Sequence, residues 1–210
     1  MIKTLSIALL ALSFISCANS QPVVQNPKIE RNKKLFAQED YYILVALRAE
    51  ELRDFISASQ LYTKLYNKTE REEYLYKALQ SDIAVKNYQL VLDKIDSLVT
   101  TKEQDNKITR FYIVALIGLL EIEKAKELTV TLVKNSQEDN DYILLSSIYL
   151  QLKENELALS TLENLYNKNF DEEILENIGT VLYIDLERKE EAISKLEMHT
   201  KTHGCSQRIC

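Results

Sequence analysis

The sequence predicts an all-α protein in which about five similar αα-hairpins follow one another along the chain. Helix-breaking residues are scarce, with three glycines and two prolines among 210 residues, which favours helices joined by short connections. The stretch LYNKTEREEYL from Leu65 matches LYNKNFDEEIL from Leu165 at seven of eleven positions. Small or β-branched residues also recur every 33 or 34 residues, at Ala58, Val91, Ala125, Ala158 and Ala192. A fixed period of this length indicates a repeat architecture.

The first element along the chain is predicted to be an export signal over residues 1–16. Lys3 precedes an apolar run from about Leu5 to Ile15, which is shorter than the ~20 residues that span a bilayer. The residues FISC, ending at Cys17, resemble a lipobox, and this resemblance implies that Cys17 is lipidated and becomes the mature N-terminus. Ala18 follows the cysteine, where Asp would favour retention at the inner membrane. By resemblance to bacterial lipoproteins, this favours the outer membrane, facing the periplasm.

Residues 17–38 are predicted to form a flexible tether behind the lipid. Both prolines of the chain, Pro22 and Pro27, lie in this segment. Proline disfavours helix, so we expect an extended and solvated spacer. The alternative to lipidation at Cys17 is ordinary cleavage after Ser20, which would release a soluble exported repeat protein that binds a peptide or protein partner.

The fourth copy of the repeat shows the hairpin pattern most clearly, over residues 141–168. Its first helix has one apolar face, formed by Tyr142, Leu145, Ile148 and Tyr149. A polar turn at 153–155 precedes a second helix, whose apolar face is formed by Ala158, Leu162, Leu165 and Tyr166. Ser146 and Ala158 are small where the two helices should meet, which lets the helix axes approach closely.

The other copies repeat these positions in chain order. The first has Tyr42, Ala46, Ala58, Tyr62 and Leu65, the second Leu75, Ala78, Val91, Ile95 and Leu98, the third Tyr112, Ile113, Ala125 and Leu132, and the fifth Leu175, Gly179, Ala192 and Leu196. We place the one extra residue of the fifth copy in its turn. These signatures resemble the tetratricopeptide repeat, a helix–turn–helix unit of about 34 residues. The resemblance covers a repeat domain over residues 39–200 and implies a right-handed superhelix.

The resemblance also implies a partner-binding groove lined by exposed positions of each first helix. Carried over residue by residue, these positions are Ile43, Leu47, Tyr76, Gln80, Arg110, Val114, Ile143, Ser147, Thr180 and Tyr183. This mixed and rather apolar set suits an amphipathic helix or an extended segment of a protein partner. Some of these side chains could instead pack against neighbouring helices. The Lys and Asn clamp by which the family holds a terminal carboxylate is not found, so we expect no carboxylate-tail receptor.

Charge and motifs argue against nucleic-acid binding and against catalysis. The formal net charge is −6, whereas nucleic-acid binding needs a basic face. The sequence contains no Gly-rich phosphate loop, no G-x-S-x-G and no H-E-x-x-H. Acidic residues alternate with lysines, as on solvated helix faces. We therefore predict a protein that is not an enzyme, with no catalytic residue, no cofactor and no small-molecule substrate.

The C-terminal segment, residues 201–210, completes HTKTHGCSQRIC, which holds both histidines of the chain and two of its three cysteines. His199 and His203 are four residues apart and would share a helical face. With Cys205 and Cys210 they offer four zinc-ligand types, but their spacing matches no strong zinc pattern, so no metal site is predicted. Outside the cytoplasm the two cysteines could form a disulfide, provided that Gly204 ends the last helix.

No polar capping helix is visible after the fifth copy. Either a partner covers the face of this copy, or the natural protein is longer.

These features together predict a lipid-anchored scaffold or adaptor of the bacterial cell envelope. Its partners would be envelope proteins, held in the groove, and the membrane, reached through the lipid, with no nucleic acid. Machines of the outer-membrane, secretion, pilus or flagellar assembly type fit this description. A metal or redox module at the C-terminus is a further hypothesis, which depends on Cys205.

Overall fold

A computed structural model describes residues 27–99, 105–204 and 206, and it describes side chains in these ranges except those of 27–36, 98 and 99. The chain divides into two compact units, residues 1–38 and residues 39–210. The second unit contains the repeats, and every regular element among the described residues is helical. The predicted signal, Cys17 and the first part of the tether lie outside the described residues.

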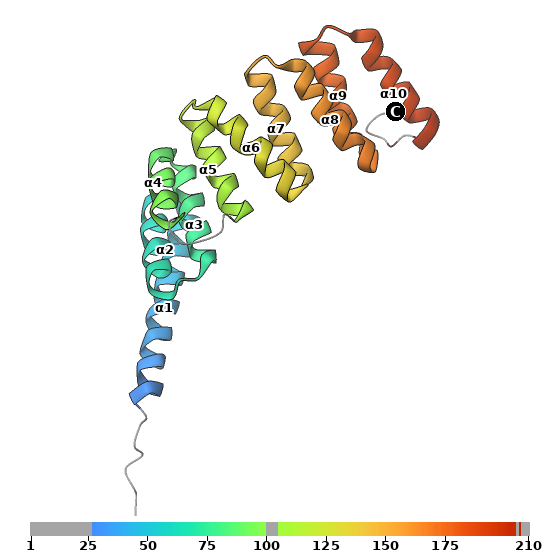
Figure 1. The fold of residues 1–210 in the computed structure, drawn as a ribbon. Helices are drawn as coiled ribbons and strands as arrows, with labels where there is room; N and C mark the ends of the chain where they lie inside the picture. Colours follow the sequence, from blue (N-terminus) through green and yellow to red (C-terminus); the bar gives the residue numbers. More distant parts are fainter. Residues whose placement is uncertain (1–26, 100–104, 205, 207–210) are drawn as a thin grey trace, which may run out of the picture. The chain divides into compact units, whose positions relative to one another are not determined.

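The helices pair into five hairpins in chain order (Figure 1). Hairpin 1 is formed by α1 (Pro27–Glu51) and α2 (Phe55–Thr69), and hairpin 2 by α3 (Glu72–Ala84) and α4 (Tyr88–Val99). Hairpin 3 consists of α5 (Asn106–Gly118) and α6 (Ile122–Ser136), and hairpin 4 of α7 (Asp139–Gln151) and α8 (Asn155–Asn169). Hairpin 5 joins α9 (Glu172–Thr180), the π-helical segment η1 (Val181–Asp185) and α10 (Lys189–His203).

A left-handed residue closes the first helix of every hairpin. Arg53, Lys86, Leu120, Lys153 and Glu187 have φ between 55° and 64°, and none of them is glycine. In hairpin 4 the Lys153 N–H donates to the Leu150 carbonyl at 3.1 Å, and the Glu154 N–H donates to the Tyr149 carbonyl at 2.9 Å. This pair of bonds is the Schellman arrangement, which satisfies the last carbonyls of a helix and reverses the chain within a few residues.

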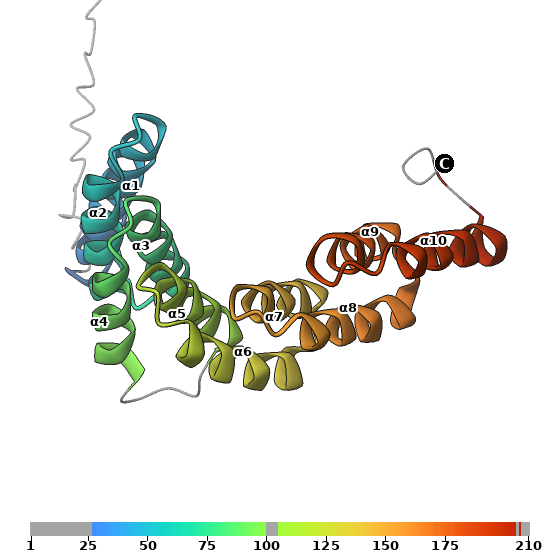
Figure 2. The ribbon, with the colours of Figure 1, turned by 90° about the horizontal axis from the view of Figure 1, so that it is seen from above.

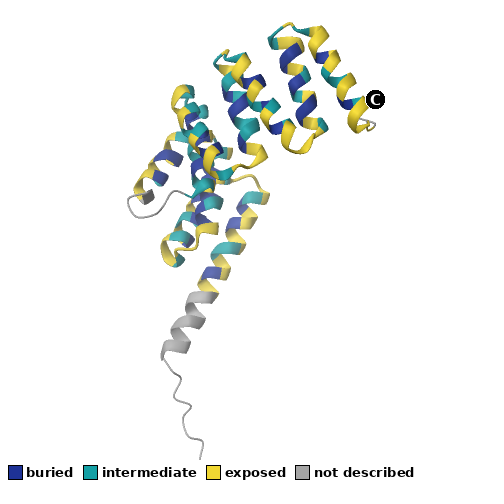
Figure 3. Ribbon diagram, turned by 45° about the vertical axis from the view of Figure 1, so that its right-hand side comes forward, coloured by how far each residue is buried: buried dark blue, intermediate teal, exposed yellow. Residues whose placement is uncertain are grey.

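Small residues bring the paired helices together, as the period predicted. Ala58, Val91, Ala125 and Ala158 are 0% exposed and Ala192 is 4% exposed. Leu79 and Ile113, which occupy the first-helix position held by Ala46 and Ser146 in hairpins 1 and 4, are also fully buried. Among the residues from 39 onward whose side chains are described, the buried positions lie on the facing sides of the helices (Figure 3). The core is therefore divided among successive junctions between hairpins.

Two details of the helices differ from the sequence-based expectations. The expected tether is not extended throughout, because α1 begins at Pro27; the fixed φ of proline suits the first turn of a helix, where its missing N–H has no partner to lose. The extra residue of hairpin 5 lies in η1, at the end of the first helix, and not in the turn. A π-helical turn accommodates one additional residue without breaking the helix.

The last helix, α10, continues to His203, past the predicted domain end at residue 200. None of the helices that the structure describes combines the length and the apolar run that crossing a bilayer requires.

Candidate partner-binding surface

Five first-helix positions form a row through the five hairpins. They occupy the same place in each first helix and are spaced by 33 or 34 residues: Leu47, Gln80, Val114, Ser147 and Thr180. Four of them are exposed and Ser147 is half-buried. In hairpins 3 and 4 the first helices, α5 and α7, lie on one side and the second helices, α6 and α8, on the other (Figure 2). We call these five residues the first-helix row.

Four other predicted groove residues are half-buried, namely Ile43, Tyr76, Arg110 and Ile143. Ile43 packs against the apolar cluster that hairpin 1 shares with α3, and Ile143 packs against the cluster that contains Ile174. The structure thus separates the predicted set into an open row and a second row that helps to join consecutive hairpins.

Arg110 of hairpin 3 is held by two acidic residues of hairpin 4. Its Nε and Nη2 donate to the two carboxylate oxygens of Asp141, each at 2.8 Å, and Nη2 also lies 2.8 Å from Glu138 Oε2. Ser136 donates a further hydrogen bond to Asp141. Burial raises the pKa of Asp141, but the hydrogen bonds from Arg110 and Ser136 and the Arg110 charge outweigh it and hold that pKa below its usual value. Arg110 therefore cross-links two hairpins.

Tyr76 of hairpin 2 makes the corresponding link to the start of hairpin 3. Its hydroxyl donates to Asp105 and lies 3.1 Å from Glu72 Oε2. Its ring stacks near Phe111, with 6.3 Å between ring centroids, and the Lys107 ammonium lies 4.1 Å from the ring centroid. Burial, followed by the neighbouring carboxylates, raises the pKa of Tyr76 and keeps the phenol neutral.

Sequence reasoning did not identify Asp105 and Asp141 as partners of the predicted groove residues. Both lie at the start of a first helix, where the helix dipole alone stabilises a carboxylate, so an acidic residue there does not indicate a partner. The side chain of Asp141 is only 2% exposed, whereas that of Glu138 is 57% exposed. This burial distinguishes Asp141 from Glu138. Because the burial depends on the neighbouring hairpin, it could not be read from the sequence of one repeat.

Tyr183 lies in η1, apart from the first-helix row. With Thr180 of the row it lines a hollow of about 370 Å³, whose other walls come from α9 and α10. The Lys189 ammonium lies 4.9 Å from the Tyr183 ring centroid. The hollow is on the last hairpin, where no further hairpin follows among the described residues.

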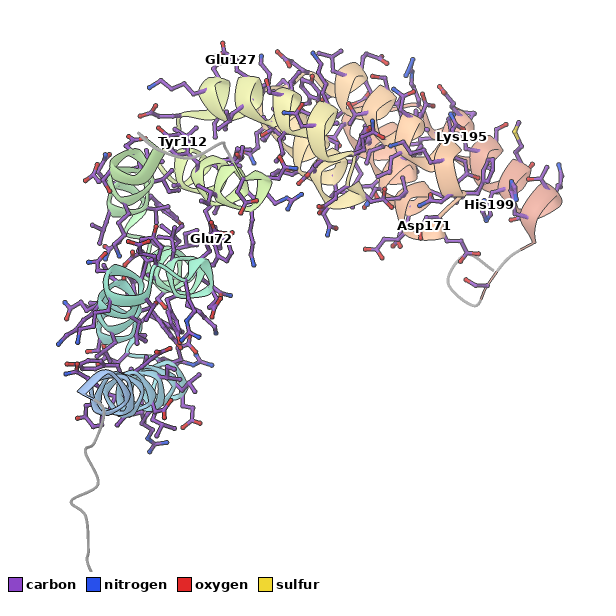
Figure 4. All side chains as sticks on the ribbon, turned by 60° about the horizontal axis from the view of Figure 1, so that its bottom comes forward. Glu72, Tyr112, Glu127, Asp171, Lys195 and His199 are labelled. Atoms are coloured by element: carbon purple, nitrogen blue, oxygen red, sulfur yellow. The ribbon has the colours of Figure 1, made fainter. Side chains whose placement is uncertain are left out.

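The C-terminal histidines share a helical face, as their spacing predicted, with ring centroids 5.1 Å apart. His199 is buried, its Nδ1 lies 2.6 Å from the Tyr166 hydroxyl, and its Nε2 lies 3.8 Å from Glu172 Oε1. Figure 4 labels His199 on α10, and it also labels Glu127, an exposed residue of α6. His203 stacks on Phe170 at 4.3 Å between centroids. These contacts fix α10 to hairpin 4 and to the start of α9.

Within residues 27–99, 105–204 and 206, no three His, Cys, Asp or Glu side chains are grouped so that they could hold a metal ion. Helix α10 ends at Gly204, which has a φ of 81°, as the disulfide hypothesis requires. Cys205 and Cys210 themselves lie outside the described residues, so their disulfide stays a prediction.

The shifted pKa values of the described residues have structural causes. Burial, and then its bonds to Asp105 and Glu72, raise the pKa of Tyr76, and the hydrogen bond to Asp141 raises the pKa of Arg110. Asp105 and Asp141 are the carboxylates concerned, and the pKa of each is lowered. Burial and these bonds between consecutive hairpins account for the four shifts without a reaction.

Sequence comparison finds no matching family profile and no curated protein that matches. Comparison of structures finds repeat proteins. MamA from Desulfovibrio magneticus RS-1, solved from residue 41 to its end, superposes with a TM-score of 0.62 at 11% identity, over 78% of this chain and 93% of the solved one. TTC0263, a thermophilic TPR protein from Thermus thermophilus, gives 0.55 at 14% identity, over 81% and 94%. YrrB, described as a TPR protein with an unusual peptide-binding site, gives 0.56 at 16% identity, over 87% and 93%.

These similarities show the fold. The chain is an all-α superhelix of tetratricopeptide-type hairpins, as the sequence predicted.

Proposed function

We propose that this protein is an interaction scaffold that binds a segment of a protein partner along the first-helix row. The observation that carries the proposal is that one position stays open to solvent, or half-open at Ser147, in all five consecutive first helices. The positions next to it are occupied by contacts between hairpins. A repeated open position on rigid helices offers a partner one contact per hairpin, which is how repeat arrays bind extended ligands.

The chemistry of the row favours a peptide or an amphipathic helix. Leu47 and Val114 keep 42% and 36% of their surface exposed, and they can contact apolar side chains. The other three residues of the row have polar side chains that can form hydrogen bonds: Gln80 lies between Leu47 and Val114, and Ser147 and Thr180 follow Val114. Arg110, four residues before Val114 of the row, is already paired with Asp141 and Glu138, so it does not suit capture of a terminal carboxylate. The peptide-binding site attributed to YrrB, a protein of the same fold, is in keeping with this proposal.

The location that we propose is the bacterial envelope, with the scaffold held at the outer membrane by a lipid on Cys17 and facing the periplasm. The support for this part is the sequence alone: the short apolar run, the FISC stretch and Ala18. Several acyl chains would hold the protein at a membrane, because each buried methylene contributes about 0.8 kcal/mol.

The row is tested by site-specific photocrosslinking in intact cells. A photoreactive residue at Gln80 or Val114 should capture the same partner, whereas the same residue at Glu127, an exposed position on the second helix α6, should not. Val114→Asp, introduced with the probe at Gln80, should abolish capture while leaving the helical circular dichroism unchanged. Equal capture from Gln80 and Glu127, or capture that survives Val114→Asp, would argue against the row.

The anchor is tested separately. Globomycin and Cys17→Ser should each leave an uncleaved precursor, and mass spectrometry of the wild-type protein should find acyl chains on Cys17. A mature N-terminus that begins after Ser20 without lipid would replace the anchored scaffold with the soluble exported one, and would leave the row untouched.

A further inference from the structure

Each internal junction uses the same face of a first helix. In α3, in α7 and in α9 with the start of η1, three positions of this face are buried against the preceding hairpin: Tyr74, Ala78 and Ser81; Asp141, Leu145 and Ile148; Ile174, Ile178 and Val181. In α5 the equivalent Ile108 and Tyr112 are half-buried and Ala115 is buried. We call this surface the leading face of a hairpin.

The leading face of hairpin 1 is exposed. Its equivalent residues are Tyr41, Val45 and Arg48; Tyr41 is 62% exposed and Val45 is 37% exposed. Leu44 and Leu52, on the same helix α1, are 67% and 64% exposed. Positions that are covered in the other four hairpins are therefore open and largely apolar at the first one.

The opposite end of the array has the matching feature. The leading face of each following hairpin packs on two second-helix positions, which in hairpins 2 and 4 are Leu92 and Ile95, and Leu159 and Leu162, all 7% exposed or less. In hairpin 5 these positions are Ile193 and Leu196. Ile193 is 54% exposed, and Leu196 is half-buried.

The hollow of about 370 Å³ lies at these two residues, and Tyr183 and Ile184 complete its apolar wall. Tyr183 and Ile184 are 50% and 67% exposed. We call this surface the trailing socket. Arrays that end in solvent carry a polar outer face on the terminal repeat, and exposed apolar surface of this kind marks an interaction site.

The two ends also match in their side-chain chemistry. At the junction of hairpins 1 and 2, Lys77 of α3 lies 3.2 Å from Glu50 of α1. The residue equivalent to Lys77 at the start of the array is Leu44, and the residue equivalent to Glu50 at its end is Tyr183. Both members of the ion pair are replaced together by apolar side chains, so the first leading face and the last socket suit each other.

We propose that the protein associates head-to-tail, with the leading face of α1 from one copy docked in the trailing socket of another. The new interface would have the form of the four internal junctions, and the array would continue from copy to copy. Such an interface is heterologous, because the two copies contribute different surfaces, and each copy keeps one free end, so assembly is open-ended. Thr180 of the first-helix row also lines the socket, but Leu44, Tyr183 and Ile193, on which this inference depends, lie outside the row.

Sedimentation equilibrium of the full chain, in density-matched detergent with a reducing agent, tests this proposal. The average mass of the wild-type protein should rise with concentration without reaching a plateau at the dimer. Leu44→Asp, next to the leading face at the position equivalent to Lys77, and Ile193→Asp in the socket should each weaken self-association at least about tenfold, because each places a charge in an apolar interface. Ile56→Asp, at an exposed position of α2 whose equivalents are all polar and exposed, should behave as wild type.

Mixing the two variants gives the sharpest result. Leu44→Asp keeps an intact socket and Ile193→Asp keeps an intact leading face, so a mixture should form a one-to-one dimer and stop there. Tyr183→Asp should substitute for Ile193→Asp in this mixture, which covers the case in which the latter folds poorly. Wild-type protein that stays monomeric at all concentrations, one single variant that still dimerises alone, or a mixture that stays monomeric while wild type associates would each overturn the proposal.

Discussion

Hairpins 4 and 5 carry equivalent residues at equivalent positions, yet one is covered and the other is open. Leu159 of hairpin 4 is 4% exposed because α9 packs on it, whereas Ile193, its equivalent in hairpin 5, is 54% exposed. The residues at this site are apolar in both hairpins. The difference in burial therefore comes from the neighbour and not from the hairpin itself, as expected for an array in which each repeat contacts only those next to it.

The largest effect should come from breaking a closed junction at its buried ion pair. Asp141→Ala leaves the Arg110 guanidinium, whose side chain is 28% exposed, without its bidentate partner. Removing one member of a buried pair costs about 3 kcal/mol, and we expect a loss of this size in the free energy of unfolding by urea. The matched control is Glu138→Ala, which removes the exposed partner of Arg110 and should cost less than about 1 kcal/mol. Equal effects of the two substitutions would contradict this description of the junction.

The same junction should respond to pH. The pKa of Asp141 is lowered in the folded protein, so the unfolded chain, with a pKa of about 3.9, takes up the proton first as the pH falls. The stabilisation by Asp141 is thus complete above about pH 5 and is lost as the pH drops through the folded-state pKa. Asp141→Asn cannot ionise, and its unfolding free energy should fall less steeply than that of wild type between about pH 5 and pH 3. Parallel profiles would mean that Asp141 does not contribute through its charge.

A glycine inside a closed junction should resist substitution. A Cβ atom at Gly118 of α5 would overlap the ring of Tyr88 on α4. Overpacking of this kind typically costs 1–3 kcal/mol, and we expect about 2 kcal/mol for Gly118→Ala in chemical denaturation. Tyr88→Leu removes the ring and should recover part of that loss when combined with Gly118→Ala. Additive effects of the two substitutions would show that the ring is not the obstacle.

A glycine at the open end should behave in the opposite way. A Cβ atom at Gly179 of α9 would have no neighbour within 4 Å. Alanine is the better helix former, so Gly179→Ala should stabilise the dilute protein by about 0.5–1 kcal/mol. The measurement is the change in the free energy of unfolding by urea. This change should be positive for Gly179→Ala and negative for Gly118→Ala. Destabilisation at both positions would mean that the last hairpin is as tightly covered as the third.

The smallest effect concerns the turns that close the first helices. Leu120 has a φ of 64° and is 83% exposed, so its side chain gains little burial while its backbone is strained. Leu120→Gly should stabilise by about 0.5 kcal/mol, because relief of the left-handed strain outweighs the added flexibility of glycine. Leu120→Ala is the control, since it removes the side chain and keeps the strain. Thermal unfolding that ranks alanine above glycine would contradict this reasoning.

The fold could be predicted because its signals are local and repeated. Ala58, Val91, Ala125, Ala158 and Ala192 mark where two helices of one hairpin meet, and all five are buried. The turns were less visible, because Arg53 and Leu120 adopt left-handed conformations without glycine. The start of α1 at Pro27 was missed because proline was taken only as a helix breaker.

The candidate surface could be predicted only in part. The spacing identified the first helices, but it predicted both Val114 and Arg110 to be exposed groove residues. Arg110 forms an ion pair with Asp141, 31 residues further along the chain. This pairing depends on how one hairpin packs against the next. Such contacts between repeats have no signature in the pattern of a single repeat.

Native-state hydrogen exchange of the dilute protein tests most directly whether neighbours supply the stability of each hairpin. Amides of α3 to α8, which have a hairpin on both sides, should exchange most slowly, and those of α1 and α10 should exchange fastest, because terminal repeats open without disturbing the others. Equal protection in all ten helices, or greater protection at the two ends, would contradict an array built from hairpins that depend on their neighbours.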